Sequence, residues 1–220
     1  DGPNRIGNNG EADNNSNITI DFGFVSPIGS IGNRVWLDNG VGGGTANNGV
    51  IDGSEAGIGN VVVSLYRDDN SDGVPDGAAI DTDTTNTGGY YLFDGLAPGN
   101  YLVALNLSNF NTGQPLAGLI SSTGNVTDQG NVNDDSTDNG IDTLDPVYGI
   151  LSSTMNITVN AEVVGETDLS NDPTDGPNFR GNNGEEDDDS DLTVDFGLFR
   201  PISLGNRVWF DTDDSGTLNG

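Results

Sequence analysis

The sequence predicts an all-β fold, a β-sandwich whose short strands are joined by long acidic loops. Glycine supplies 34 of the 220 residues, and Asn, Thr and Asp are abundant while Ala, Glu and Lys are scarce. This composition opposes helices and favours short strands that end in turns. Hydrophobic residues make up 32% of the chain, which is low but sufficient for a thin β core.

Strand signals recur along the middle of the chain, each rich in β-branched or aromatic residues and bounded by Gly, Asn, Asp or Pro. The predicted strands are 34–37, 61–67, 90–93, 101–107, 155–163 and 192–198. In 101–107 the odd positions Tyr101, Val103, Leu105 and Leu107 share one face, which a sandwich would bury. The segment 88–101, with its central Pro-Gly turn, predicts a β-hairpin.

Charge and composition exclude several functions. The formal net charge of -29 repels nucleic acid and anionic membrane surfaces, so neither is an expected partner. The chain has no Cys and no His, and all six basic residues are Arg. Disulfides, thiolate metal sites, histidine general bases and lysine chemistry are therefore excluded. So strong a negative charge instead points to bound metal cations as the neutralising partner.

An internal repeat organises the chain. Residues 1–11 return as 175–185, the motif at 18–23 returns at 192–197, and Gly-Asn-Arg-Val-Trp at 32–36 returns at 205–209 with one residue lost shortly before it. We therefore expect residues 1–30 to be the C-terminal part of a preceding repeat, 31–199 a complete repeat, and 200–220 the start of the next one.

Asp and Asn recur at alternate positions in the loop that follows 61–67. Asp68, Asn70 and Asp72 occupy positions 1, 3 and 5 of a calcium-loop pattern, a Gly occupies position 6, the Val74 carbonyl position 7 and Asp76 position 9. This spacing is specific and predicts a Ca²⁺ site. The alternative is an acidic turn that water alone solvates.

A second loop follows the Trp of 32–36, where Asp38 is separated from the rest of the pattern by a Gly-rich insertion. Asn48, Asp52 and Glu55 fit positions 5, 9 and 12, so Asp38 must fold back to complete a Ca²⁺ site. In the equivalent loop of the next repeat, Asp211, Asp213 and Ser215 occupy positions 1, 3 and 5 and predict a further Ca²⁺ site.

Two further acidic stretches have weaker patterns. The stretch 128–142 predicts a looser Ca²⁺ site, with Asn-Gly turns as the alternative explanation. Its candidate ligands are Asp134, Asp135, Asp138 and Asp142. The run 185–189 is better explained as a solvated charged loop than as a metal site.

The ordered motifs carry a family resemblance. Gly32-Asn-Arg-Val-Trp-Leu-Asp38, Val61-Val-Val-Ser-Leu-Tyr-Arg-Asp68, the 89–101 segment and Thr193-Val-Asp-Phe-Gly197 resemble the SdrD B-type repeats of bacterial surface proteins. The resemblance implies a Greek-key sandwich of the prealbumin or Cna B-like type, calcium in the loops, and a rigid stalk or fibre spacer outside the cell. The lack of Lys excludes a Lys–Asn isopeptide bond, and 109–164 is long for the family pattern, which leaves room for an extra hairpin or a contact surface.

Two classes of function remain, and neither is enzymatic, because nothing singles out a catalytic pair among the acids. The first is an extracellular structural repeat, cell-surface or secreted, rigidified by Ca²⁺, whose partners are neighbouring repeats and identical chains in a fibre. The second is an adhesin module that binds a glycan or a protein. Its candidate contacts are Trp36, Tyr66, Tyr90, Tyr91 and Tyr148, although such aromatics are more often core. The segment 17–25 could pair within its own module or be donated across a junction.

Overall fold

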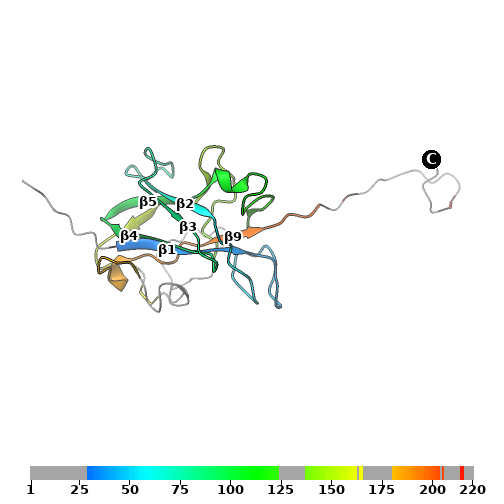
Figure 1. The fold of residues 1–220 in the computed structure, drawn as a ribbon, viewed down its shortest axis with the longest axis horizontal. Helices are drawn as coiled ribbons and strands as arrows, with labels where there is room; N and C mark the ends of the chain where they lie inside the picture. The colour runs from blue at the N-terminus through cyan, green and yellow to red at the C-terminus, as the bar shows by residue number, and fades with distance from the viewer. Residues whose placement is uncertain are drawn as a thin grey trace, which may run out of the picture.

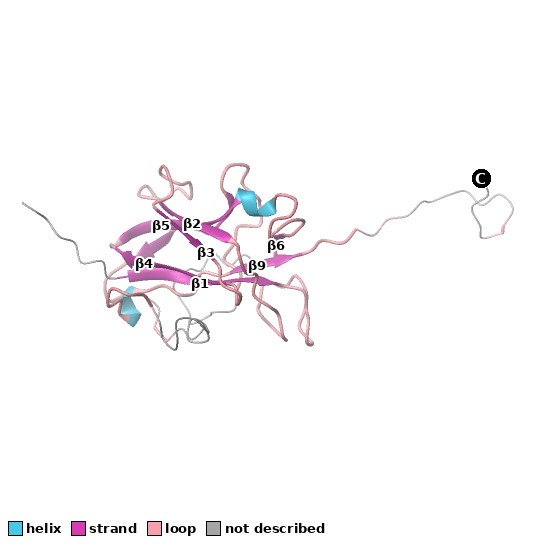
Figure 2. Cartoon of the chain, in the orientation of Figure 1, coloured by secondary structure: helices cyan, strands magenta, loops and turns pink. Residues whose placement is uncertain are grey.

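A computed structural model describes residues 29–123, 137–162, 164–165, 180–203, 205 and 214–215. These residues form a sandwich of two β-sheets with long loops at both ends (Figures 1 and 2), and the only helical elements among them are short 3-10 turns. The predicted all-β class is confirmed. Within the described part of the chain, no helix is long and apolar enough to cross a membrane.

The strands are short and separated by turns, as the composition predicts. Their bounds are β1 Gly29–Leu37, β2 Val62–Arg67, β3 Asp81–Thr84, β4 Tyr90–Leu96, β5 Gly99–Asn106, β6 Ile120–Ser121, β7 Gly149–Leu151, β8 Met155–Ile157 and β9 Phe196–Phe199. Two 3-10 turns accompany them, η2 at Leu107–Phe110 and η4 at Asp187–Asp189.

One sheet has the order β4-β1-β9-β6, and the other has the order β3-β2-β5-β7, with β8 also paired to β5. The core lies between them and is built from alternating side chains of both sheets. Tyr101, Val103 and Leu105 of β5 are buried in this core, as predicted, whereas Leu107 is half-buried because the strand has ended and η2 begins there. At one side the sheets are joined by a side chain, because Asp83 on edge strand β3 accepts the backbone N–H of Leu92 on β4 at 2.9 Å.

The first and last strands are neighbours. Val35 to Leu37 of β1 pair in parallel with Phe196 to Leu198 of β9, and the backbone N–H of Gly32 donates to the Asp191 carbonyl at 3.1 Å. The stretch 191–199 is therefore built into the sheet of its own module. It is the counterpart of 17–25, which lies outside the described residues.

The predicted hairpin at 88–101 is wrong, although its two strands and its turn exist. β4 pairs with β1 and β5 pairs with β2, so the turn at Pro98 carries the chain from one sheet to the other. Local turn chemistry is the same for a hairpin and for such a crossover. Only the partners of the two strands distinguish the two structures.

The segment 109–164 is not an appended hairpin in its described part. It supplies β6 to one sheet and both β7 and β8 to the other, so it completes the sandwich. The division of the chain at residues 30 and 199 stays a prediction. The described strands run from Gly29 to Phe199.

Candidate functional site

The Asp68 loop, residues 68–76, follows β2 and folds around one buried carboxylate. Asp68 is fully buried; its Oδ1 accepts the backbone N–H of Asp72 at 3.0 Å and its Oδ2 accepts that of Gly73 at 3.1 Å. Gly73 has φ 76°, a left-handed conformation that glycine adopts without strain. The chain therefore turns around Asp68 at the glycine that the spacing marks.

The other predicted ligands of this loop lie on the same turn. The Oδ1 of Asn70 accepts the N–H of Asp72 at 3.1 Å, and the Oδ1 of Asp72 accepts that of Val74 at 3.0 Å. Asp76 completes the network, because its Oδ2 accepts the N–H of Asn70 at 3.4 Å. Asn70, Asp72 and Asp76 are exposed, so their oxygens remain accessible from solvent.

The Asp38 loop, residues 38–55, repeats this arrangement across its insertion. Asp38 is also fully buried; its Oδ1 accepts the backbone N–H of Asn47 at 2.6 Å and its Oδ2 accepts that of Gly49 at 2.9 Å. Residues 39–46 loop out between these contacts. The chain thus returns to Asp38 and places Gly49 against it, as the Asp68 loop places its own glycine.

The remaining predicted residues of the Asp38 loop are linked to one another. Asn48 accepts the N–H of Val50 through Oδ1 at 3.1 Å and donates through Nδ2 to Asp52 at 3.2 Å. Glu55 is nearly buried, and its two carboxylate oxygens accept the N–H groups of Gly40 at 2.7 Å and Asp52 at 3.3 Å. Glu55 therefore holds both the insertion and the loop that follows it.

Each buried carboxylate also receives a hydroxyl that the sequence analysis did not identify. Ser122 Oγ donates to the Oδ2 of Asp38 at 2.7 Å, and Thr154 Oγ1 donates to the Oδ2 of Asp68. These donors lie 84 and 86 residues away from their acceptors. No local spacing could have found them, because only the fold brings the segments together.

Asp138 lies beside the Asp38 loop. Its backbone N–H donates to the Gly49 carbonyl at 2.8 Å, and its Oδ1 accepts the N–H groups of Gly140 at 2.9 Å and Gly197 at 3.1 Å. Burial raises the pKa of Asp138 to about 7, an effect that these two N–H donors only partly offset. Asp138 therefore lies beside the Asp38 loop, and a separate Ca²⁺ site in 128–142 stays a prediction.

The other predicted positions are placed as follows. Asp142 is exposed. Ser215 is exposed too, while Asp134, Asp135, Asp211 and Asp213 lie outside the described residues. The acidic run 185–189 is only partly solvated, because Asp189 is buried and accepts the backbone N–H of Asn160 at 2.7 Å.

The two loops offer the oxygen donors that Ca²⁺ prefers, namely carboxylates, side-chain amides and backbone carbonyls. In the described ranges, no group of three or more Asp, Glu, His or Cys side chains is arranged to hold a metal ion together. The carboxylates of both loops instead accept backbone N–H groups. The donor chemistry thus fits a hard cation, while the geometry of both loops is that of hydrogen-bonded turns.

The aromatic residues considered for adhesion divide into two groups. Trp36, Tyr90 and Tyr91 are buried and serve the core. Tyr66 and Tyr148 are half-buried and contact each other edge-on, with ring centroids 5.4 Å apart. Only this pair among them presents aromatic surface to solvent.

A two-sheet sandwich whose acidic loops are built around buried carboxylates defines a β-sandwich module. The chain belongs to the SdrD B-like domain family, whose model matches residues 29–163, more than half of its length. The resemblance to SdrD B-type repeats that the sequence motifs indicate is thereby confirmed.

Relatives of the chain include staphylococcal proteins. The chain is 36% identical over 129 residues to serine-aspartate repeat-containing protein F of Staphylococcus epidermidis, a match that covers 54% of the chain and 7% of that protein. It is 35% identical over 112 residues to serine-aspartate repeat-containing protein D of Staphylococcus aureus strain Newman, covering 46% of the chain and 8% of that protein. The chain therefore spans less than a tenth of the relatives it matches.

Proposed function

We propose that the module is a structural repeat of an extracellular surface protein or fibre, stiffened by Ca²⁺ bound in the Asp68 and Asp38 loops. The observation that carries this proposal is the shared scaffold of the two loops. In each one a fully buried Asp accepts two backbone N–H groups of its own loop and one hydroxyl from a distant segment.

Electrostatics favours a cation at these places. The hydrogen bonds to Asp38, Asp68 and Asp138 come from uncharged donors, so three buried carboxylates lack a positive partner among those contacts. Burying a charge without a counter-charge is costly, and the chain as a whole carries a net charge of -29. A divalent cation at each loop lowers both costs.

The positions of the loops suit a stiffening role. The backbone N–H of Asp68 donates to the Asn100 carbonyl, and this start of β5 lies beside β8 and the start of β1. Asp38 follows the end of β1, and its backbone N–H donates to the Leu198 carbonyl of β9. The two loops therefore order opposite ends of the sandwich, where neighbouring repeats would join.

The pairing of β1 with β9 suits a load-bearing role. Because these two strands are parallel, tension that pulls on the start of β1 and the end of β9 drives them past each other. Such a load acts on all their mutual hydrogen bonds together instead of opening them one at a time. Survival under tension is governed by the unfolding rate, which this arrangement keeps low.

A thermal melt of the chain, read by circular dichroism in about 10 mM Ca²⁺ and then in excess chelator, tests the calcium mechanism. With the dissociation constant of about 10⁻⁴ M typical of extracellular modules, each occupied site contributes about 2.7 kcal/mol. We therefore expect Ca²⁺ to raise Tm by about 5–10 °C per site. An identical Tm in both solutions would contradict calcium stiffening.

A matched pair of variants assigns the effect to a loop. Asp72→Asn removes one exposed charge from the Asp68 loop and keeps an Oδ1 that can accept the N–H of Val74. Asp81→Asn removes one exposed charge from edge strand β3, outside both loops. The proposal expects the first variant to lose part of the calcium-dependent rise in Tm and the second to keep all of it.

A second candidate function is an adhesin module, favoured by the half-buried Tyr66–Tyr148 pair. Rings of this kind bind glycans and protein partners through stacking. Tyr66→Ala would abolish binding on a glycan or matrix-protein array if the pair is an adhesive contact. Unchanged binding, or none with the parent chain, would remove this candidate.

A further inference from the structure

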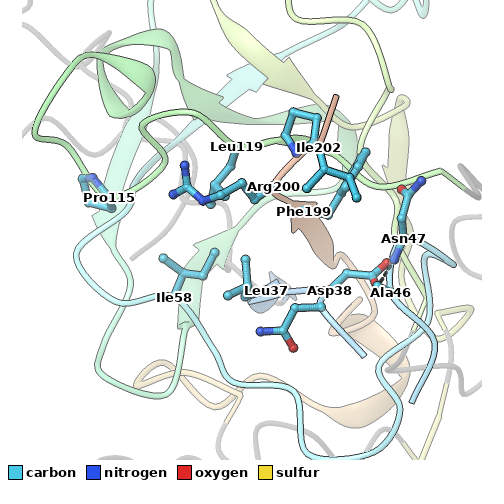
Figure 3. A pocket seen from close by; sticks show the side chains of 12 residues that line it. Leu37, Asp38, Ala46, Asn47, Ile58, Pro115, Leu119, Phe199, Arg200 and Ile202 are labelled. Carbon is cyan, nitrogen blue, oxygen red and sulfur yellow. Dashed lines mark hydrogen bonds between the residues drawn. The ribbon is translucent and has the colours of Figure 1, made fainter. Parts of the chain in front are cut away.

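An apolar groove opens at the end of the sandwich where β9 finishes. It encloses about 870 Å³, and Figure 3 shows Leu37, Ile58, Leu119 and Phe199 converging on it, with Asp38 and Asn47 of the Asp38 loop at its edge. Ile202 also lines the groove, although this side chain is 94% exposed. An isoleucine so fully exposed over an apolar groove marks a surface that gains stability when it is covered.

The distance to the following repeat is set by the sequence. Because Gly205 and its next four residues repeat 32–36, Ser203 is the counterpart of Ser30 in β1. Only Arg200, Pro201 and Ile202 separate it from the last residue of β9. Four residue steps span at most about 14 Å, so the following repeat begins within that distance of the groove.

The Pro-Ile pair of this linker recurs. Pro27 and Ile28 precede β1 of the described module, as Pro201 and Ile202 precede the counterpart of β1 in the next repeat. Proline restricts the backbone of the linker, and the isoleucine places an apolar side chain beside it. A short stiff linker with an exposed apolar residue favours contact between modules over free rotation.

The start of the module supplies a complementary surface. Gly29 pairs with Leu96, and a Cβ built on Gly29 would lie 2.8 Å from Ile157, so the turn at Pro98 and the residues after β8 surround the point where the chain enters. Pro98 is exposed there and Val159 is 50% exposed. In a following copy of the module, the equivalent apolar groups would face the groove.

Charge supports the same pairing. Arg200 lies at the rim of the groove, where its Nη2 donates to the Ala117 carbonyl at 3.4 Å. The start of the module is acidic, with the Asp68 loop on one side and η4, whose three residues are Asp, on the other. Contact between Arg200 and this acidic surface favours a head-to-tail arrangement over contact between two identical ends.

We propose that the following repeat docks into the groove. Its contact surface consists of the residues equivalent to Pro98 and to 158–161. This surface packs against four residues of the described module, Leu37, Ile58, Phe199 and Ile202. The proposal rests on the proposed function in one respect, that the module occurs in series. It adds that consecutive modules share an apolar interface and form one rigid body. The partner is thus a second copy of this fold within the same chain.

The test uses the chain extended by its own sequence, with residues 1–202 followed by residues 30–220, so that the natural linker joins two complete modules. In saturating Ca²⁺, NMR backbone relaxation measures whether the modules tumble together, and amide shifts of Leu37, Leu119 and Phe199 report on the groove. We expect one common correlation time, and groove amide shifts in the first module that differ from those of the 220-residue chain.

Two variants separate docking from folding. Ile202→Asp changes an exposed linker residue, and Ile80→Asp changes a 52% exposed isoleucine beside edge strand β3. We expect Ile202→Asp to return the groove amides to their single-module shifts and to let the modules tumble separately, while Ile80→Asp leaves the junction intact. Independent tumbling of the parent tandem, with groove shifts unchanged from the single module, overturns the proposal. The calcium melt of the single chain is unaffected by either result, so failure of docking and failure of the calcium mechanism are distinguishable.

Discussion

The Asp68 and Asp38 loops have the same hydrogen-bond scaffold but differ in the number of residues that form it. The Asp68 loop closes within nine consecutive residues, whereas the Asp38 loop closes only after the insertion 39–46. In both, the first Asp is buried and accepts the N–H of the loop glycine. The unit common to both loops is therefore a turn around one carboxylate, and the chain between its parts varies in length.

The two loops also differ at position 12 of the calcium-loop pattern, where only the Asp38 loop has a carboxylate. Glu55 joins the insertion to the second half of the Asp38 loop by accepting the N–H groups of Gly40 and Asp52. The corresponding position of the Asp68 loop is Ala79, which has no such side chain. The longer loop therefore depends on an additional carboxylate, because ordering more residues costs more conformational entropy.

The largest expected effect is that of removing either central carboxylate. Asp38→Ala and Asp68→Ala each leave two N–H groups and one hydroxyl without their acceptor, so each should lower the free energy of unfolding by about 3–5 kcal/mol. Asp38→Ala should cost more, because its contacts with Gly49 and Ser122 are buried. Denaturant unfolding in excess chelator measures both, with exposed Asp76→Ala as the control. The shared scaffold is refuted if either variant behaves like that control.

A comparable effect is expected from pH beside the Asp38 loop. Asp138 has a pKa of about 7 in the folded protein, above its ordinary value of 3.8, so the folded state binds its proton more tightly than the unfolded state does. Its contribution to stability is complete below about pH 4, and it falls by about 4 kcal/mol as pH rises to about 7. Denaturant unfolding in chelator at a series of pH values checks this.

Asp138→Asn isolates that contribution. The amide oxygen of Asn can still accept the N–H groups of Gly140 and Gly197, both of which contact Oδ1 of Asp138. The difference in unfolding free energy between the parent and the variant should change between pH 4 and 7 and stay constant above. A pH-independent difference would show that Asp138 ionises normally in the folded protein.

A smaller effect is expected on the calcium affinity of the Asp38 loop, and it tests whether the two loops bind Ca²⁺ independently. Glu55→Gln removes one of two carboxylate oxygens from the position that in twelve-residue calcium loops binds the ion through both. We expect roughly tenfold weaker calcium affinity at the Asp38 loop, equivalent to about 1.4 kcal/mol. NMR titration of the Gly49 and Gly73 amides reads the two loops separately. Equal weakening at both glycines would contradict independent loops.

The smallest expected effects belong to the distant hydroxyls. Ser122→Ala and Thr154→Val each remove one donor to a buried carboxylate and should lower the free energy of unfolding by about 1 kcal/mol. The loss should be larger for Ser122, which is fully buried, than for the half-buried Thr154. Denaturant midpoints at constant m value provide the measurement. No change in either variant would show that the N–H groups alone hold these carboxylates.

Much of the fold could be predicted because the central strands have local signals. Their β-branched and aromatic residues located β2 to within one residue and β5 to within two. The edge strand β3, with the sequence Asp-Thr-Asp-Thr, was missed because a polar edge strand has no apolar face to detect. β6 and β7 were missed because they have only two and three residues, too few for any periodicity.

The same distinction applies to the site. The Asp68 loop is contiguous, so spacing alone identified its members. The spacing of residues along the chain could not identify Ser122 and Thr154, which lie far from their acceptors in sequence. Nor could it predict that Asp138 lies beside Gly49. In each case the missing information is which strand lies beside which.

The sequence by itself determined the strand-rich class, the family and the available chemistry, because composition, turn residues and motif order are local properties. It also restricted any metal ligands to oxygen by containing neither Cys nor His. The tertiary structure alone decided that β4 and β5 lie in opposite sheets, that β9 runs parallel to β1, and that the two loops occupy opposite ends. These features depend on non-local strand pairing, which is set by the packing of one sheet on the other and leaves no trace in local spacing.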